Sequence, residues 1–175
     1  MTVIRRIRIG EADLFKRMRL ASLMDAPYAF SSTCDEALRR SDESWREQAE
    51  RTAQGPDRAT FIAFSDDAPI GIAALYRLPG QNVEGELIQM WVAPEHRGKR
   101  VAWDLLDVVF EWASENSFHS VLARVTKENV RALKFYRKYG FDLETEMLLD
   151  DFDGVAMVRA VVFIKSAEEA YKKIK

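Results

Sequence analysis

The segment from Met90 to Leu106 constrains the fold most strongly, because an apolar strand is followed there by a proline turn, a basic loop and a helix. The loop, residues 97–102, contains a glycine among basic side chains. The first amides of a helix lack intrahelical acceptors, and the helix dipole places positive charge at the same end. The segment therefore predicts a site for a pyrophosphate group at the start of the helix. An ordinary solvated loop before a helix is the alternative.

A second segment, residues 126–141, predicts a short helix that ends at Gly140. Asn129, Ala132 and Tyr136 are spaced three and four residues apart and therefore share one face of this helix. Ala132 would leave room for a narrow ligand, and the polar side chains on either side of it would supply hydrogen bonds. The alternative is an amphipathic helix whose tyrosine packs in the core.

Taken in this order, the two segments resemble the GNAT superfamily of acyl-CoA-dependent N-acetyltransferases. The family's loop pattern, Gln/Arg-x-x-Gly-x-Gly/Ala, is met at Arg97 and Ala102, whereas Arg100 stands where the central glycine is usual. The later pattern, Asn-x-x-Ala-x-x-x-Tyr-x-Lys-x-Gly-Phe, is met at every fixed position: Asn129, Ala132, Tyr136, Lys138, Gly140 and Phe141. The resemblance covers residues 86–141, about a third of the chain.

The resemblance implies that acetyl-CoA is the acyl donor. Its binding residues are then Met90, Trp91, Val92, Arg97, Gly98, Lys99, Arg100, Val101, Ala102, Asn129, Ala132, Tyr136 and Lys138. The first three would pair with the pantetheine amides through their backbone, as an added strand does.

Arg100 is the departure from the family pattern. Glycine at this position lets the backbone approach a phosphate without a Cβ atom in the way. If the local φ is helical, the Cβ costs little and the guanidinium can bind phosphate. If it is not, the cofactor site is weakened.

Transfer of an acetyl group to nitrogen needs a base, because an ammonium group has no lone pair. Glu86 matches the position of a glutamate used as base in part of the family, and a surface strand carboxylate is the alternative. Three other glutamates compete for the role: Glu84, Glu144 and Glu146. By the same resemblance, Tyr136 is the general acid that protonates the departing thiolate, and the Met90 N–H stabilises the oxyanion.

The resemblance places the acceptor between the first two helices and the last hairpin. Aromatic side chains on the helical side are Tyr28, Phe30 and Trp45. Acidic side chains on the hairpin side are Glu144, Glu146, Asp150, Asp151 and Asp153. A site entrance lined by these aromatic and acidic side chains, the aromatic mouth, would suit the cationic amine of a small molecule or a peptide. The alternative is that the aromatics belong to the core and the acids to a solvated turn.

The charge balance argues against a nucleic-acid partner, because 26 Lys and Arg residues stand against 28 Asp and Glu, a net charge of -2. Cys34 is the single cysteine, and with His96 and His119 the sequence offers no metal-ligand spacing, so no metal is expected. No apolar run reaches the roughly 18 residues of a membrane span, and the N-terminus lacks a signal-peptide pattern. We expect a cytoplasmic protein whose exposed edge strands would allow a homodimer.

Three classes of function fit these segments to different degrees. An acetyl-CoA-dependent N-acetyltransferase accounts for both of them. An acyl-CoA-binding module with little turnover is the alternative that Arg100 suggests. A dinucleotide-binding oxidoreductase is disfavoured, because no Gly-x-Gly-x-x-Gly follows the strand.

The order of the expected elements predicts one mixed α/β sheet. The resemblance implies a single N-acetyltransferase-like domain over residues 1–175, with a mostly antiparallel sheet of about seven strands flanked by about four helices. The expected strands are Val3–Ile9, Thr60–Phe64, Ile70–Tyr76, Glu86–Val92, Ser120–Val125, Phe141–Leu149 and Val155–Ile164. The expected helices are Glu11–Met24, Ser41–Ala53, Val101–Ser114 and Asn129–Tyr139. Residues 28–33 are expected to form a loop, and residues 166–175 a frayed, charged tail.

Overall fold

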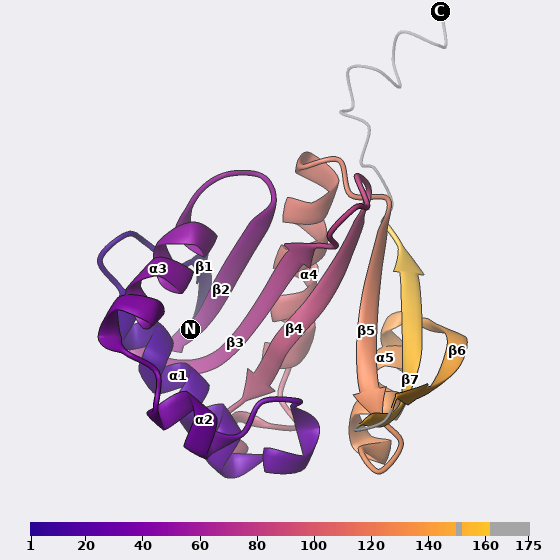
Figure 1. Ribbon diagram of the computed structural model, residues 1–175, viewed down its shortest axis with the longest axis horizontal. Helices are drawn as coiled ribbons and strands as arrows, with labels where there is room; N and C mark the ends of the chain where they lie inside the picture. Colours follow the sequence, from indigo (N-terminus) through magenta and orange to yellow (C-terminus); the bar gives the residue numbers. More distant parts are fainter. Residues whose placement is uncertain (150–151, 162–175) are drawn as a thin grey trace, which may run out of the picture.

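A mixed sheet of seven strands forms the centre of the computed structural model, which describes residues 1–149 and 152–161 (Figure 1). The strands are β1 (Thr2–Arg6), β2 (Arg58–Ser65), β3 (Ala68–Arg77), β4 (Glu84–Val92), β5 (Ser120–Thr126), β6 (Asp142–Leu149) and β7 (Phe152–Ala160). Their order across the sheet is β1-β2-β3-β4-β5-β7-β6, and β4 and β5 are parallel whereas all other neighbours are antiparallel. The predicted fold class is confirmed.

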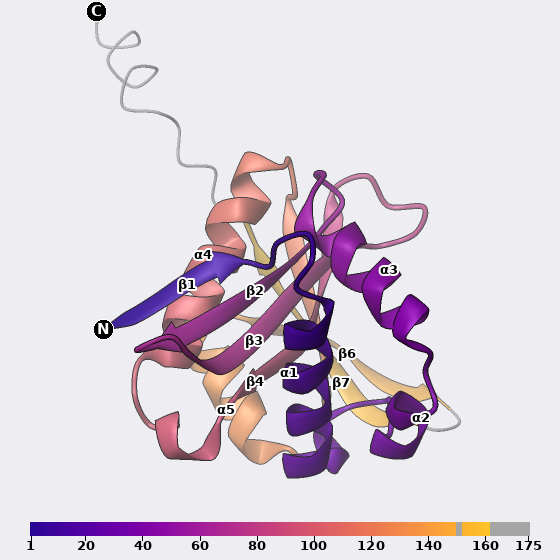
Figure 2. The ribbon, with the colours of Figure 1, turned by 90° about the vertical axis from the view of Figure 1, so that its left-hand side faces the viewer.

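Helices cover both faces of this sheet. The helices are α1 (Ala12–Asp25), α2 (Cys34–Leu38), α3 (Asp42–Ala53), α4 (Val101–Glu115) and α5 (Val130–Tyr139). Short 3-10 turns at Pro27–Ala29 and Pro94–His96 follow α1 and β4. Figure 2 shows α1 and α3 in front of the sheet and α4 behind it. The described chain is therefore a three-layer arrangement.

Each layer of helices has its own apolar core against the sheet. Leu105, Leu106 and Val109 of α4 are fully buried in the core that α4 and α5 share with the strands. On the other face, Phe15 of α1 packs edge-on against Trp45 of α3, with the ring centroids 5.7 Å apart. Alternate residues of the central strands supply both cores, since successive side chains point to opposite faces.

The structure contains α2, which the sequence analysis did not predict. The Thr33 hydroxyl accepts a hydrogen bond from the Glu36 N–H at 3.2 Å, and the Glu36 carboxylate accepts one from the Thr33 N–H at 2.8 Å. This reciprocal pair is a capping box, whose Thr-x-x-Glu signature was visible in the sequence. The described residues therefore form five α-helices, and the four predicted ones are confirmed to within one residue at each end.

Most predicted strand boundaries shift by one to three residues, and two C-terminal ends differ by more than one residue. β1 ends at Arg6 rather than at Ile9, because the chain turns through Gly10, whose φ is +88°, into α1. β7 ends at Ala160, and the predicted end at Ile164 and the tail 166–175 lie outside the described residues. That the whole chain forms a single domain stays a prediction.

A bulge in β4 interrupts its pairing on one side and precedes its separation from the neighbour on the other. Ile72 of β3 pairs with Trp91 and Ala74 pairs with Ile88, so β4 carries one extra residue between these pairs. Gln89 lies in this stretch with a positive φ of 59°. Pairing of β4 with β5 covers only residues 84–87, and the two strands diverge beyond it (Figure 1).

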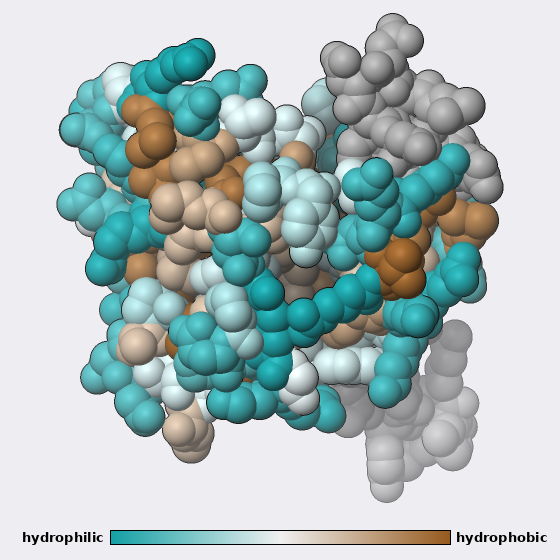
Figure 3. Space-filling view, turned by 90° about the horizontal axis from the view of Figure 1, so that it is seen from below, coloured by the Kyte–Doolittle hydropathy of each residue, from teal (hydrophilic) through white to brown (hydrophobic). Residues whose placement is uncertain are grey.

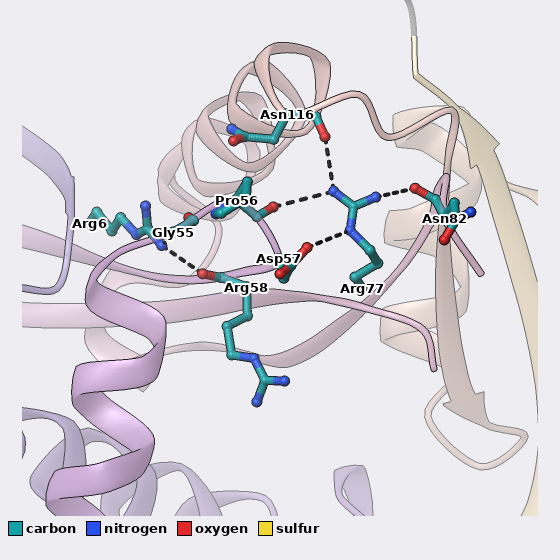
Figure 4. A network of polar contacts seen from close by, with 8 residues as sticks. All are labelled: Arg6, Gly55, Pro56, Asp57, Arg58, Arg77, Asn82 and Asn116. Atoms are coloured by element: carbon teal, nitrogen blue, oxygen red, sulfur yellow. Dashed lines mark hydrogen bonds and ion pairs between the residues drawn. The ribbon is translucent and has the colours of Figure 1, made fainter. Parts of the chain in front are cut away.

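At the other end of β4, the Arg77 guanidinium joins several loops (Figure 4). Its Nη2 donates to the carbonyl oxygens of Asn116 and Pro56 at 3.0 and 3.4 Å, and its Nη1 donates to that of Asn82. Its Nε donates to the Asp57 carboxylate at 3.0 Å. The side chain is 18% exposed, so this cation is a partly buried staple between the sheet and the end of α4.

Replacement of Arg77 by Met should lower the free energy of unfolding by about 2–3 kcal/mol, because the carbonyls it serves lose a charged donor while the aliphatic stem is kept. Arg51→Met is the matched control, since Arg51 is exposed in the last turn of α3. Urea denaturation followed by circular dichroism measures both. Equal midpoints for the two variants would contradict the structural role given to Arg77.

Candidate active site

A cavity of about 340 Å³ lies beside the part of β4 that no longer pairs with β5. Its walls come from β4 beyond the bulge, the loop before α4, α5 and the turn that follows α1. Most of the predicted cofactor residues line it: Met90, Trp91, Val92, Arg97, Gly98, Lys99, Ala102, Asn129, Ala132 and Tyr136. Where these elements meet, on the lower side in Figure 1, the surface is hollowed between hydrophilic side chains (Figure 3).

The loop before α4 leaves several backbone amides at the mouth of this cavity. The first intrahelical bond of α4 runs from the Asp104 N–H to the Arg100 carbonyl oxygen at 3.0 Å, so the preceding amides have no acceptor within the helix. Gly98 has a φ of +74°, which turns the loop toward the helix start. Lys99 is exposed and makes no ion pair with any described residue. This end of α4 therefore has the geometry and charge of an anion site.

Three predicted cofactor residues lie outside the main cavity. Arg100 is the N-cap of α4 with a helical φ of -74°, so its Cβ causes no backbone strain. Its guanidinium donates to Asp104 at 2.9 Å and to Asp107 at 3.4 Å, along the outside of the helix. The Val101 side chain is buried in the core, and Lys138 is exposed on α5. Their side chains do not line this cavity, and Arg100 lines a smaller recess beside it.

Asp25, at the end of α1, fastens the cavity wall, and the sequence analysis did not identify it. Its carboxylate accepts a hydrogen bond from the Trp91 indole at 2.8 Å and another from the Arg97 guanidinium. Burial opposes ionisation of Asp25, but the two bonds and the charges of Arg97 and Arg131 together outweigh it and hold its pKa below the usual 3.8. A negative charge at a helix C-terminus interacts unfavourably with the helix dipole. This position in the sequence could have indicated that Asp25 has a cationic partner.

The same contacts change the role of Arg97. Its Nε donates to the Val92 carbonyl oxygen at 2.9 Å while its Nη2 is bound to Asp25. Arg97 was predicted from the sequence to bind the cofactor. In the structure its side chain joins the loop to β4 and α1, which leaves Lys99 and the backbone amides to face an anion.

The predicted stripe on α5 faces the cavity. The Asn129 side-chain oxygen accepts a hydrogen bond from the Ala132 N–H at 3.1 Å and thereby caps the helix, which leaves its NH₂ group for a ligand. Tyr136 is 7% exposed and packs on Phe141 with the ring centroids 5.2 Å apart. Burial raises the pKa of its phenol far above the usual value, so the hydroxyl stays protonated at neutral pH.

Glu86 lies apart from the cavity lining, in the part of β4 that still pairs with β5. Its carboxylate accepts a hydrogen bond from Arg124 at 2.8 Å, and the side chain is 19% exposed. Burial raises its pKa, and the charge of Arg124 opposes that shift. Among its competitors, Glu84 is half-buried and Glu144 is exposed, whereas the side chain of Glu146 lies outside the described set.

The predicted aromatic mouth is only partly present. Tyr28 and Phe30 line the cavity. Trp45 instead follows the alternative of a core residue, because its ring is 2% exposed and packs between α1 and α3. Of the acids expected opposite them, Glu144 is exposed. The other four, Glu146, Asp150, Asp151 and Asp153, lie outside the residues whose side chains are described.

Over residues 1–149 and 152–161, no cluster of three or more His, Cys, Asp or Glu side chains could hold a metal ion. Within the same residues, no helix is both long enough and apolar enough to cross a membrane.

The same fold occurs in solved structures of acetyltransferases. A GNAT-family acetyltransferase from Streptococcus pneumoniae superposes with a TM-score of 0.77 at 17% identity, covering 93% of this chain and all of that one. YncA from Salmonella typhimurium, a putative acetyltransferase solved with acetyl-CoA, gives 0.76 at 14% identity over 95% and 97% of the two chains. PaiA N-acetyltransferase from Thermoplasma acidophilum, solved with coenzyme A, gives 0.74 at 20% identity over 91% and 99%.

Sequence comparison agrees with the structural one. An uncharacterised N-acetyltransferase of Bacillus subtilis, YobR, is 40% identical over 57 residues, which are 33% of this chain and 23% of that protein. The model of the acetyltransferase (GNAT) family matches residues 21–141, more than half of the chain. The chain therefore belongs to the GNAT family of acetyltransferases.

Proposed function

We propose that the protein transfers an acetyl group from acetyl-CoA to the primary amine of a small molecule or peptide by direct attack in a ternary complex. The observation that carries the proposal is one cavity in which an unpaired strand edge, an anion site and a buried tyrosine meet. Family membership and the two similar structures that hold CoA or acetyl-CoA support it.

The residues at the cavity suit the parts of acetyl-CoA. Lys99 and the amides from Gly98 onward offer positive charge to the pyrophosphate. β5 no longer pairs with β4 at Met90–Val92, so backbone groups of this stretch are available to the pantetheine amides, like a strand edge to an added strand. Ala132 leaves room beside that edge, and the Asn129 amide adds a donor.

The reaction needs a proton to leave the amine and another to reach the sulfur. The amine nitrogen attacks the acetyl carbonyl carbon, and the Met90 N–H binds the developing oxyanion. The C–N bond forms, the C–S bond breaks, and Tyr136 gives its proton to the thiolate. The amine proton passes to Glu86 through a water molecule, because Glu86 does not line the cavity and is held by Arg124.

Turnover of an amine panel with acetyl-CoA, measured by release of free thiol, tests the proposal. Thiol release that requires both protein and amine supports transfer. Tight binding of acetyl-CoA with no release for any amine would favour the alternative, an acyl-CoA-binding module.

Gly98→Ala should weaken acetyl-CoA binding about tenfold, because its φ of +74° costs an L-residue about 1–2 kcal/mol and the loop would shift. No atom lies within 4 Å of the added Cβ, so the effect is conformational rather than a clash. Gly80→Ala is the matched control, with a φ of +75° in an equally open place away from the cavity. Isothermal titration calorimetry measures the affinity of both variants for acetyl-CoA. Equal affinities would show that the pyrophosphate does not bind at the Gly98 loop.

Tyr136→Phe keeps the ring against Phe141 and removes the proton donor. We expect kcat to fall about 10²-fold, at the low end for a positioned acid because a thiolate is a tolerable leaving group. The dissociation constant for acetyl-CoA should hardly change. A kcat equal to that of the wild type would show that Tyr136 only packs against its neighbours and does not act as the acid.

Glu86→Gln should lose most activity at low pH and recover as the pH rises toward the amine pKa near ~10, where free amine no longer needs a base. Burial raises the pKa of Glu86, so the wild-type rate should rise through the titration of this carboxyl on the acid side. Glu84→Gln, two residues earlier on the same strand, is the control. A loss that is uniform across the pH–rate profile would show that Glu86 positions the acceptor instead.

A further inference from the structure

Arg19 is a buried cation with no acidic partner among the described residues. It lies on the core-facing side of α1 and is 6% exposed. Its guanidinium donates to the Ser22 hydroxyl at 3.1 Å and makes no ion pair with any carboxylate of the described residues. Its pKa is lowered to about 10, chiefly by burial, while Tyr76 acts in the opposite sense and the charge of Arg40 adds a smaller decrease. A buried charge of this kind is costly unless a partner of opposite sign is supplied.

The neighbours of Arg19 add donors rather than acceptors. Arg40 lies 3.8 Å from the Trp45 ring centroid and bonds only to Ser44, so it too makes no ion pair in the described chain. The Tyr76 hydroxyl oxygen accepts a hydrogen bond from the Gln48 amide at 3.1 Å, and a phenol is itself a donor. The electrostatic influence of Tyr76 reaches both arginines. Two guanidinium groups and a phenol thus form a set of donors that no carboxylate of the described residues serves.

This donor set adjoins the proposed catalytic groups. The Arg19 guanidinium lies 5.0 Å from the ring centroid of Phe30, which lines the cavity. Tyr76 pairs with Glu86 across β3 and β4, and paired residues on one face have Cβ atoms about 5 Å apart. Leu75 and Leu87, their neighbours on the two strands, belong to the core under α4, so Tyr76 and Glu86 lie on the opposite face of the sheet, the one that α1 and α3 cover (Figure 2).

We propose that Arg19, with Arg40 and Tyr76, binds a carboxylate of the acceptor, so that the acceptor is amino-acid-like, with its amine a few bonds from a carboxylate. The inference rests on the proposed acetyl transfer and narrows its substrate class. An arginine fork fits a carboxylate by two parallel hydrogen bonds. The amine end then lies toward Glu86 and the thioester. This differs from the cationic acceptor that the aromatic and acidic residues suggested.

The test compares matched acceptors in the thiol-release assay: a panel of L-amino acids, their amides and the corresponding decarboxylated amines. The carboxylate raises the pKa of the nearby amine, so chemistry alone favours the amides at neutral pH. We expect the reverse order, with kcat/KM at least tenfold higher for the best amino acid than for its amide. Amides or simple amines that react as well as the acids would overturn the inference and leave the transferase proposal standing.

Variants of Arg19 test whether this residue causes the preference for a carboxylate. Arg19→Met should raise KM for the amino acid at least tenfold and leave KM for its amide within about twofold, because only the acid loses a charged partner. Arg17→Met, an exposed position on the same helix, is the control. A merely structural role would change both substrates alike, and that result would also overturn the inference.

If no amine of any series releases thiol, the transferase proposal fails. A binding measurement then tests whether Arg19 binds a carboxylate. Calorimetric titration of the amino-acid panel into the protein–CoA complex should show binding that Arg19→Met abolishes and the amides lack. Absence of such binding would overturn the site itself.

Discussion

The cavity depends on one backbone irregularity, the bulge at Gln89. A non-glycine residue with a φ of 59° costs about 1 kcal/mol or more, and such outliers concentrate at functional sites. The Gln89 side-chain oxygen is also buried without a partner among the described residues. The bulge turns β4 away after Leu87, where its ladder with β5 ends. Without the bulge, β5 would form hydrogen bonds with the backbone groups of β4 that the proposed acyl donor needs.

The divergence of β4 and β5 stays local because both ends of β4 are held. The Ala93 N–H donates to the Ile70 carbonyl oxygen at 2.8 Å, which keeps the end of β4 on β3. Asp25 then joins Trp91 and Arg97 to α1, while the Arg77 staple fixes the opposite end. The result is a preorganised gap, whose walls do not have to be ordered by the ligand.

Local patterns predicted the parts of the site that are set by local geometry. The basic loop and the Asn129–Tyr136 stripe were readable because helix starts and helix faces follow short spacings, and the structure brings both to one cavity. Even so, Asn129 also serves as the N-cap, which its position before an apolar helix could have indicated. The capping box of α2 was equally visible and was overlooked.

Residues whose roles depend on distant partners were not predictable in the same way. An arginine in an amphipathic helix looks solvated, and only the packing of α1 on the sheet buries Arg19. Likewise, Arg97 matched the phosphate pattern, but its partner Asp25 lies 72 positions earlier in the chain. Trp45 could have been a ligand contact or a core residue, and the edge-on stacking against Phe15 decided for the core.

A crystal structure of the protein with CoA tests most directly whether the β4 bulge creates the functional site. The account predicts the pantetheine arm between the diverging strands, hydrogen-bonded to the backbone of Met90–Val92, with the sulfur near the Tyr136 hydroxyl and the pyrophosphate at the loop of Gly98 and Lys99. CoA bound outside this gap, or β4 and β5 paired continuously beyond Leu87 in the complex, would contradict it.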